Sequence, residues 1–232
     1  MRRTFIWATA LTLFLSGTAG AADYALVEGG SGVCKAYLQN LNSFPGHPPM
    51  ACRRPLNPKF LEFTKPDWEP LDVMKNLGLV ETIGRVRYRS LAPEQFEKWK
   101  ASIKSQVVEF HLSLATADLD VNGDGVPEPV VRYDEGDCDP GAAFTFMMPS
   151  GTTFYVLTPD RTQVDPQKTR WLDLHGRPEL VLYKGQVFIS TWHGNQRFKD
   201  GLLRLHTTLA AVGQGTIVCD YRYQGTWPRR QP

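Results

Sequence analysis

The sequence lacks an excess of charge of either sign and, beyond its first residues, lacks a long apolar run. Its 26 Lys and Arg residues nearly balance its 24 Asp and Glu residues, for a formal net charge of +2. A basic excess is the electrostatic footprint of nucleic-acid binding, so its absence disfavours a nucleic-acid partner. A membrane-spanning helix needs about 20 consecutive apolar residues, and we expect no membrane span in the mature chain.

Several short patterns that mark catalytic sites are also missing. The chain has no H-E-x-x-H zinc motif, no G-x-S-x-G or S-x-x-K serine motif, and no phosphate-binding P-loop. None of its five histidines lies four residues from another, which removes the common helical spacing for a metal-binding pair. The sequence therefore favours a protein without catalytic activity, although it leaves an enzyme open.

Residues 1–22 have the features of a secretory signal peptide. Arg2 and Arg3 supply a positive start, an apolar run follows over residues 5–15, and small residues at 19–21 fit a cleavage site. A membrane anchor is the alternative, but the apolar run is shorter than a membrane span. Removal of this segment leaves equal numbers of basic and acidic residues. We expect a soluble bacterial protein that is periplasmic or secreted.

The four cysteines of the chain all follow this segment. They are Cys34, Cys52, Cys138 and Cys219. An even number of cysteines in an exported chain favours disulfides. A zinc site is the alternative, but no C-x-x-C or paired-histidine spacing supports it. Of the three possible pairings we favour Cys34–Cys52 with Cys138–Cys219, because each pair falls within one compositional region.

Three regions follow the signal segment. Residues 23–70 form a Pro-rich N-terminal segment, which a disulfide would staple, and residues 71–106 have helical apolar spacing. Residues 107–232 form a β domain that contains the loop discussed below. The expected helices cover residues 33–41 and 71–82 and a third segment that starts near Pro93, a residue suited to a first helical turn.

Short β-rich runs separated by turn residues fill the last region. Lys184-Gly185, between two such runs, predicts a tight hairpin. The predicted fold class is α+β, an antiparallel β-sheet domain with a helical, Pro-rich N-terminal layer. The expected strands cover residues 107–114, 129–133, 142–148, 152–158, 179–183, 186–192, 202–208 and 216–223.

One segment has the spacing of a calcium-binding loop. Calcium takes six to eight oxygen ligands, and a loop can supply them when alternate residues point inward. The expected ligands are Asp120, Asn122, Asp124, Val126 through its backbone carbonyl, and Glu128. A second register that begins at Asp118 is possible, but it puts Val126 and Pro129 where acidic residues should be.

The stretch 118–133 resembles the D-x-[DN]-x-D-G-x-x-[DE] calcium loop of FG-GAP/VCBS-type repeats, in which the loop joins two strands. The resemblance implies a calcium ion with a structural role. The segment is also similar to half of an EF-hand loop, but Val131 stands where an EF-hand needs a bidentate Glu. A surface turn rich in Asp, Asn and Gly is the alternative interpretation. The acidic run at 134–139 is either a solvated turn or a source of further oxygens for the ion.

Residues 173–183 repeat part of this pattern. They keep an Asp-x-x-Gly start and a Pro-Glu-x-Val core, and Arg177 could place a guanidinium where the cation would lie. We interpret the segment as either a degenerate second copy or a chance similarity between two hairpins. Two copies are too few for a propeller, which needs several repeats.

The last third of the chain is rich in aromatic residues, which serve either as core or as a contact surface. A possible binding face contains Trp192, His193 and Trp171. The leading hypothesis is an exported, calcium-stabilised, non-catalytic binding domain of the bacterial envelope with a protein or glycan partner. The alternatives are an envelope hydrolase with a site near His193, and a structural subunit of a surface assembly.

Overall fold

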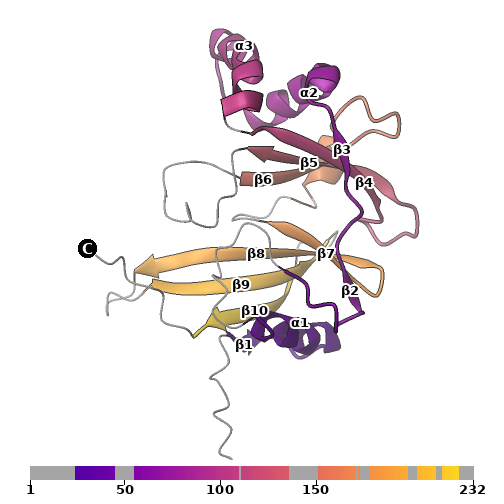
Figure 1. The fold of residues 1–232 in the computed structure, drawn as a ribbon, viewed down its shortest axis with the longest axis vertical. Coiled ribbons are helices and arrows are strands. Elements are labelled where there is room, and N and C mark those ends of the chain that lie inside the picture. Colours follow the sequence, from indigo (N-terminus) through magenta and orange to yellow (C-terminus); the bar gives the residue numbers. More distant parts are fainter. Residues whose placement is uncertain are drawn as a thin grey trace, which may run out of the picture.

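A computed structural model of the chain describes residues 24–44, 55–109, 111–135, 151–170, 172, 178–197, 203–212 and 216–224. Within them the chain forms four layers, in which two antiparallel sheets lie face to face and helices cover their outer faces (Figure 1). The predicted α+β class with antiparallel sheets is confirmed.

The larger sheet has six strands in the order β1-β10-β9-β8-β7-β2. Their bounds are Tyr24–Glu28 for β1, Phe63–Thr64 for β2, Glu179–Tyr183 for β7, Gln186–Arg197 for β8, Leu203–Ala211 for β9 and Thr216–Tyr223 for β10. The strands at the two ends of the described chain are neighbours, because Tyr24 pairs with Tyr223. The sheet therefore crosses the regional boundaries that the composition indicates.

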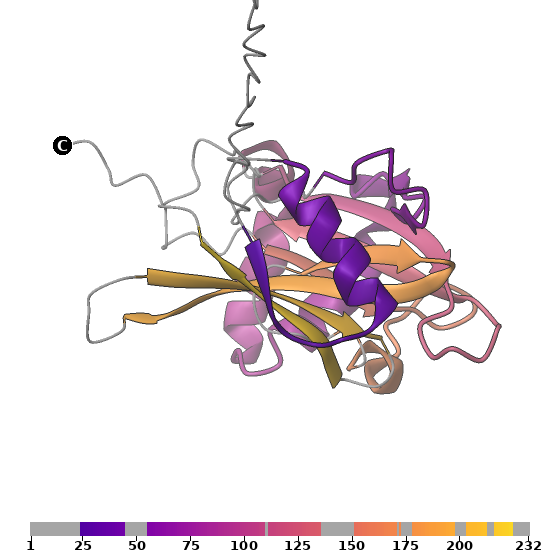
Figure 2. The same ribbon diagram turned by 90° about the horizontal axis from the view of Figure 1, so that it is seen from below.

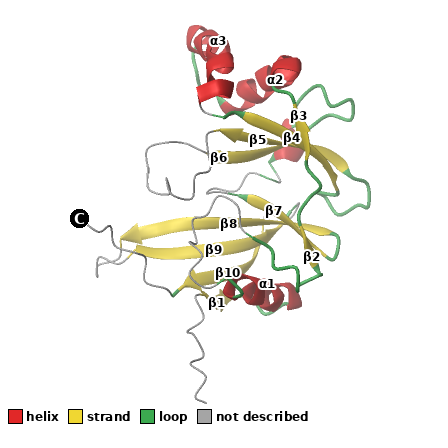
Figure 3. Ribbon diagram, viewed as in Figure 1, coloured by secondary structure: helices red, strands yellow, loops and turns green. Residues whose placement is uncertain are grey.

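The smaller sheet has four strands in the order β3-β4-β5-β6. Their bounds are Glu69–Leu71 for β3, Ser113–Leu119 for β4, Glu128–Glu135 for β5 and Gly151–Val156 for β6. The helical elements, coloured red in Figure 3, are α1 at Gly32–Asn42, a short 3-10 turn η1 at Met74–Asn76, α2 at Leu77–Arg87, α3 at Pro93–Glu109 and α4 at Pro166–Thr169.

An apolar layer between the sheets forms the centre of the molecule. It takes alternate residues from both sheets, such as Val130 and Val156 from the smaller sheet and Leu180 and Ile189 from the larger, and these are at most 1% exposed. The residues between them face outward and meet the helices. Strands buried on both faces are apolar throughout, which explains runs such as Val-Phe-Ile at 187–189.

The outer faces are covered by different helices. Helix α1 lies across the larger sheet (Figure 2), where the Tyr37 hydroxyl donates to Ser190 Oγ at 2.8 Å. Helices α2 and α3 cover the smaller sheet through Val80, Ile83 and Ile103. Each helix therefore buries its apolar stripe against a sheet.

The structure confirms some predicted elements in detail. Strands β7 and β10 have the predicted bounds, and α1 differs from the predicted helix by one residue at each end. Lys184 and Gly185 both have positive φ angles, 52° and 84°, as a two-residue hairpin turn of type I′ requires.

Other expectations were wrong. The strand expected at 107–114 is the end of α3 followed by the start of β4, because Val107 packs against the helix-covered core as a helical residue. The helix expected at 71–82 begins six residues later, and 69–71 is strand β3 instead. Strand β1 was not expected, since its partner lies near the far end of the chain. The strand expected at 142–148 lies outside the described residues.

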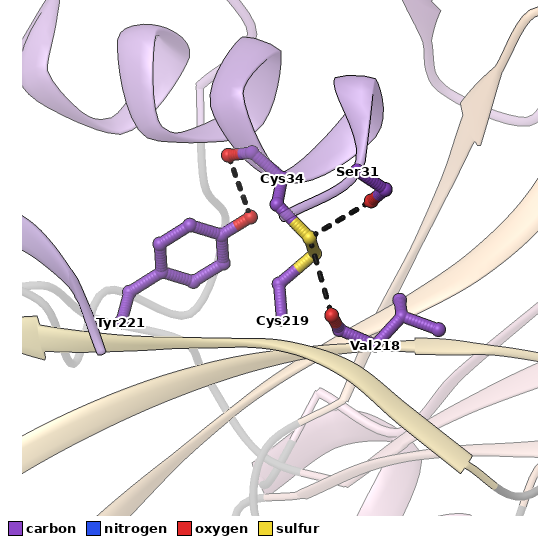
Figure 4. Close-up of a disulfide and its surroundings, with 5 residues drawn as sticks. All are labelled: Ser31, Cys34, Val218, Cys219 and Tyr221. Atoms are coloured by element: carbon purple, nitrogen blue, oxygen red, sulfur yellow. Dashed lines mark hydrogen bonds between the residues drawn. A yellow bond between two sulfur atoms is a disulfide. The ribbon is translucent and has the colours of Figure 1, made fainter. Parts of the chain in front are cut away.

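The favoured disulfide pairing was also wrong. Cys34 is bonded to Cys219, with their Cα atoms 5.5 Å apart (Figure 4). The reasoning from compositional regions failed because α1 packs on β10, so residues 185 positions apart in the sequence become neighbours. The Tyr221 hydroxyl fixes the same junction by donating to the Cys34 carbonyl at 3.0 Å. Cys52 and Cys138 lie outside the described residues.

The packing of α2 on α3 leaves no room beside Gly84. A Cβ atom there would meet the ring of Trp99, whereas a Cβ at Gly78 of the same helix would meet nothing within 4 Å. We predict that Gly84→Ala lowers the free energy of unfolding by about 1–3 kcal/mol through overpacking. Gly78→Ala should raise it by up to about 1 kcal/mol through helix propensity. Urea unfolding measures both, and equal stabilisation by the two changes would contradict this packing.

Candidate metal centre

The predicted calcium loop joins two neighbouring strands at the middle of the smaller sheet. It occupies residues 120–127 between β4 and β5, and it is closed by the pairing of Leu119 with Glu128 (Figure 1). Two of its glycines, Gly123 and Gly125, have φ angles of 78° and 85°, a conformation that glycine adopts without steric cost. The loop can therefore fold back on itself over a few residues.

Asp120 organises the backbone of this loop. Its Oδ1 accepts the N–H groups of Gly123 and Asp124 at 2.7 and 3.1 Å, and its Oδ2 accepts the N–H of Gly125 at 2.9 Å. One carboxylate thus satisfies three backbone donors that no strand partner reaches. Asp120, the first residue of the predicted ligand set, therefore holds the loop backbone in place at Gly123, Asp124 and Gly125.

Asn122 connects the remaining acidic side chains. Its Nδ2 donates to Asp124 Oδ2 at 2.7 Å and to Glu128 Oε1 at 2.9 Å, while its Oδ1 accepts the Asp124 N–H at 2.8 Å. Two carboxylates therefore converge on a single donor group. The Val126 N–H and the Asn122 amide lower the pKa of Asp124, which favours its charged form.

Glu128 is the buried acid of the site. It is 5% exposed, its Oε2 accepts the Val121 N–H at 3.1 Å, and its Oε1 accepts from Lys168 Nζ at 2.9 Å. A buried carboxylate needs a counter-charge, and here a lysine from α4 supplies it. The hydrogen bond to Glu128 raises the pKa of Lys168, which favours the charged form of the lysine. The sequence pattern did not indicate Lys168, which lies 40 residues away.

The residues of the alternative register have other partners. Both oxygens of Asp118 accept from Arg161 Nη2, at 2.8 and 2.7 Å. The side chain of Val126 is 64% exposed, so only its carbonyl could serve as a ligand. The side chains of Asn122, Asp124 and Glu128 are thus brought together, Asp120 binds the loop backbone, and Asp118 is engaged elsewhere.

The donor set fits a hard cation. Its atoms are oxygens of carboxylates, an amide and a backbone carbonyl, which is the chemistry that calcium prefers. Among the described residues, no group of three or more His, Cys, Asp or Glu side chains is arranged to hold a metal ion. In the predicted set, Asn122 joins Asp124 to Glu128, while Asp120 accepts only from backbone N–H groups of the loop. In this structure, hydrogen-bond donors face two of these carboxylates. The Asn122 amide donates to Asp124 and Glu128, and the Lys168 ammonium donates to Glu128.

The two described residues of the acidic run, Asp134 and Glu135, do not contribute to this loop. Asp134 and Glu135 lie at the end of β5 opposite Glu128, which is about 20 Å away at the rise of an extended strand. Glu135 accepts from Arg87 Nη2 at 2.6 Å and from the hydroxyls of Tyr88 and Tyr133 at 2.7 and 2.9 Å. Burial and the bond to Glu135 raise the pKa of Tyr88 to about 12. This cluster ties α2 to the sheet, and residues 136–139 lie outside the described residues.

The possible second copy is described only from Pro178 onward. Glu179 opens β7 as Glu128 opens β5, and it forms an ion pair with Lys65 at 2.8 Å. Both segments thus place a glutamate at the start of a strand, opposite a lysine from a distant segment. Arg177, the guanidinium proposed as the substitute cation, lies outside the described residues.

Two residues of the candidate binding face, Trp192 and His193, are consecutive in β8. Trp171 lies outside the described residues. The strand register makes His193 the Cα partner of His206, which in turn pairs with Arg222 on β10. The Asp-Gly at 200–201 is a hairpin signal that could have revealed this pairing from the sequence.

Comparisons with protein families, with curated proteins and with solved structures found no match for the chain. Its function is therefore argued from the site and the fold alone.

The contrast between Asp120 and Asp118 can be tested without calcium. Asp120→Ala should lower the free energy of unfolding by about 1–3 kcal/mol in the presence of a chelator, because the N–H groups of Gly123 and Gly125 lose their acceptor and that of Asp124 keeps only Asn122 Oδ1. Asp118→Ala breaks only a half-exposed ion pair with Arg161 and should cost less than about 1 kcal/mol. Urea unfolding of both variants gives the comparison. A larger loss for Asp118→Ala would show that the alternative register organises the loop.

Proposed function

We propose that this chain is an exported, calcium-stabilised, non-catalytic binding domain of the bacterial envelope, with a protein or glycan as its partner. The observation that carries the proposal is that the side chains of Asn122, Asp124 and Glu128 meet at one end of the β4–β5 hairpin, in a loop whose backbone Asp120 holds. The stretch 118–133 also resembles FG-GAP/VCBS-type loops, whose calcium is structural.

The disulfide supports the exported part of the proposal. The bond between Cys34 and Cys219 joins the first helix to the last strand, and such bonds persist in the periplasm and outside the cell. None of the helices among the described residues is long and apolar enough to span a membrane. The N-terminal segment 1–22 has the pattern of an export signal and lies outside the described residues.

Calcium in this loop would act as a structural brace. The side-chain oxygens of Asp120, Asn122, Asp124 and Glu128 and the carbonyl of Val126 would hold it. When bound, the ion supplies two positive charges against the three carboxylates of Asp120, Asp124 and Glu128. The residues on either side of the loop, Leu119 and Val130, belong to the apolar layer between the sheets. A brace at this hairpin would therefore stabilise the layer on which both sheets depend.

The β8–β9 hairpin is the proposed contact surface. Among the described residues, β9 pairs with β10 only from His206 onward, whereas its pairing with β8 continues to Leu203. The two strands therefore extend past their neighbours as a two-stranded arm (Figure 1). A two-stranded ribbon has marginal stability alone and leaves backbone groups at both edges for a partner to pair with. Trp192 and His193 lie at the base of this arm.

Thermal unfolding tests the calcium brace. If the dissociation constant is about 1 µM, 1 mM calcium should stabilise the mature chain by about 4 kcal/mol relative to chelator. For a chain of this size the gain corresponds to a rise in Tm of roughly 8–16 °C. Asp124→Ala should abolish the rise, and Asp118→Ala should retain it. No shift in the unmodified chain would mean that the loop is a hydrogen-bonded turn.

Affinity purification from the bacterial envelope tests the binding role. The mature chain should retain one stoichiometric envelope protein, or sediment with cell-wall glycan, and a double change Trp192→Ala with His193→Ala should weaken this by about tenfold or more. Turnover of ester, phosphate or glycan substrates that His193→Ala abolishes would instead establish the hydrolase. Self-association into a large particle without a partner would establish a structural subunit.

A further inference from the structure

Lys168 reaches the loop from a separate, well-anchored turn. Helix α4 is capped by Asp165, whose side chain accepts the N–H groups of Gln167 and Lys168. The turn is held to β6 because the Asp165 N–H donates to the Val156 carbonyl at 2.8 Å and the Val156 N–H donates to Thr169 Oγ1 at 3.0 Å. The backbone that carries Lys168 is therefore fixed independently of the loop.

The ammonium group meets the loop at its most buried carboxylate. Lys168 Nζ lies 2.9 Å from Glu128 Oε1, and the same oxygen accepts from Asn122 Nδ2 at 2.9 Å. The side chain of Glu128 is 6% exposed and that of Lys168 is 37% exposed. The lysine can therefore turn outward into solvent by rotating about its own side chain, whereas Glu128 cannot leave.

We propose that Lys168 is a displaceable counter-ion that competes with calcium for Glu128 and so sets the affinity of the loop. This inference rests on the proposed calcium site. In the ion-free chain the ammonium neutralises the buried carboxylate and keeps the loop folded. A divalent cation that binds Glu128 repels the ammonium, because two positive charges would share one oxygen in a poorly solvated place. Calcium therefore replaces the Lys168 ammonium at Glu128, and each binding event releases the lysine.

The exchange has a defined consequence for affinity. The free energy that Lys168 contributes to the ion-free loop is lost when calcium enters, so the two cations are negatively coupled. Removing the charge of Lys168 should tighten calcium binding and destabilise the ion-free chain. Moving the lysine does not require α4 to unfold, because Thr169 and Asp165 hold it to β6.

Calcium titration calorimetry on a matched set of variants tests the proposal. Lys168→Met keeps the aliphatic stem and removes the charge, and it should bind calcium about 5- to 100-fold more tightly than the unmodified chain. Lys168→Arg keeps the charge and should bind with an affinity close to that of the unmodified chain. The control is Lys65→Met, which breaks the corresponding ion pair with Glu179 and should leave calcium affinity unchanged. In chelator, Lys168→Met should have a lower Tm, which calcium restores.

The outcomes separate this inference from the proposed function. Calcium binding to Lys168→Met but not to the unmodified chain would overturn the exchange, because calcium would then be unable to displace the lysine. Equal affinity in the unmodified chain and Lys168→Met would overturn the exchange and leave the calcium site intact. Absence of binding in every variant, with all of them folded by circular dichroism, would overturn both.

Discussion

The apolar layer between the two sheets is the constraint on which the rest of the structure depends. Because residues such as Val130 and Ile189 face it from opposite sides, the outer face of each sheet must be covered by something else. Helix α1 covers one and the α2–α3 pair covers the other. The six-stranded sheet is completed by β1 from the start of the described chain, and the Cys34–Cys219 bond closes that junction. The order of the layers follows from where apolar surface must be buried.

The candidate metal centre lies at the edge of that layer, where burial and charge conflict. Glu128 is 5% exposed at the start of a core strand, and an isolated buried carboxylate is costly. Asn122, the Val121 N–H and Lys168 together satisfy it. The same arrangement explains how one site could accept either a lysine or a calcium ion. Both supply positive charge to an oxygen-rich loop whose shape Asp120 maintains through three backbone N–H groups.

Much of the β structure and the geometry of the loop could be predicted from the sequence, because both are local. Strands β7 and β10 and the turn at Lys184-Gly185 follow from alternation and turn chemistry. Within the spacing Asp120, Asn122, Asp124 and Glu128, hydrogen bonds join the last three side chains, and Asp120 accepts from the loop backbone. Calcium itself stays a prediction.

What could not be predicted is non-local. The partner of β1, the Cys34–Cys219 bond and the Lys168–Glu128 contact each join segments that are far apart in the sequence. Only the stacking of the layers brings them together. The end of α3 was mistaken for a strand. A short apolar run such as that around Val107 fits the spacing of a helix and of a strand equally well.

A crystal structure of the mature chain grown in millimolar calcium, with anomalous diffraction recorded at long wavelength, tests the central claim most directly. We predict one anomalous peak per chain, surrounded by Asp120, Asn122, Asp124, Glu128 and the Val126 carbonyl, with Lys168 turned away from Glu128. A map without a peak at this position, and with Lys168 still bonded to Glu128, would contradict the account.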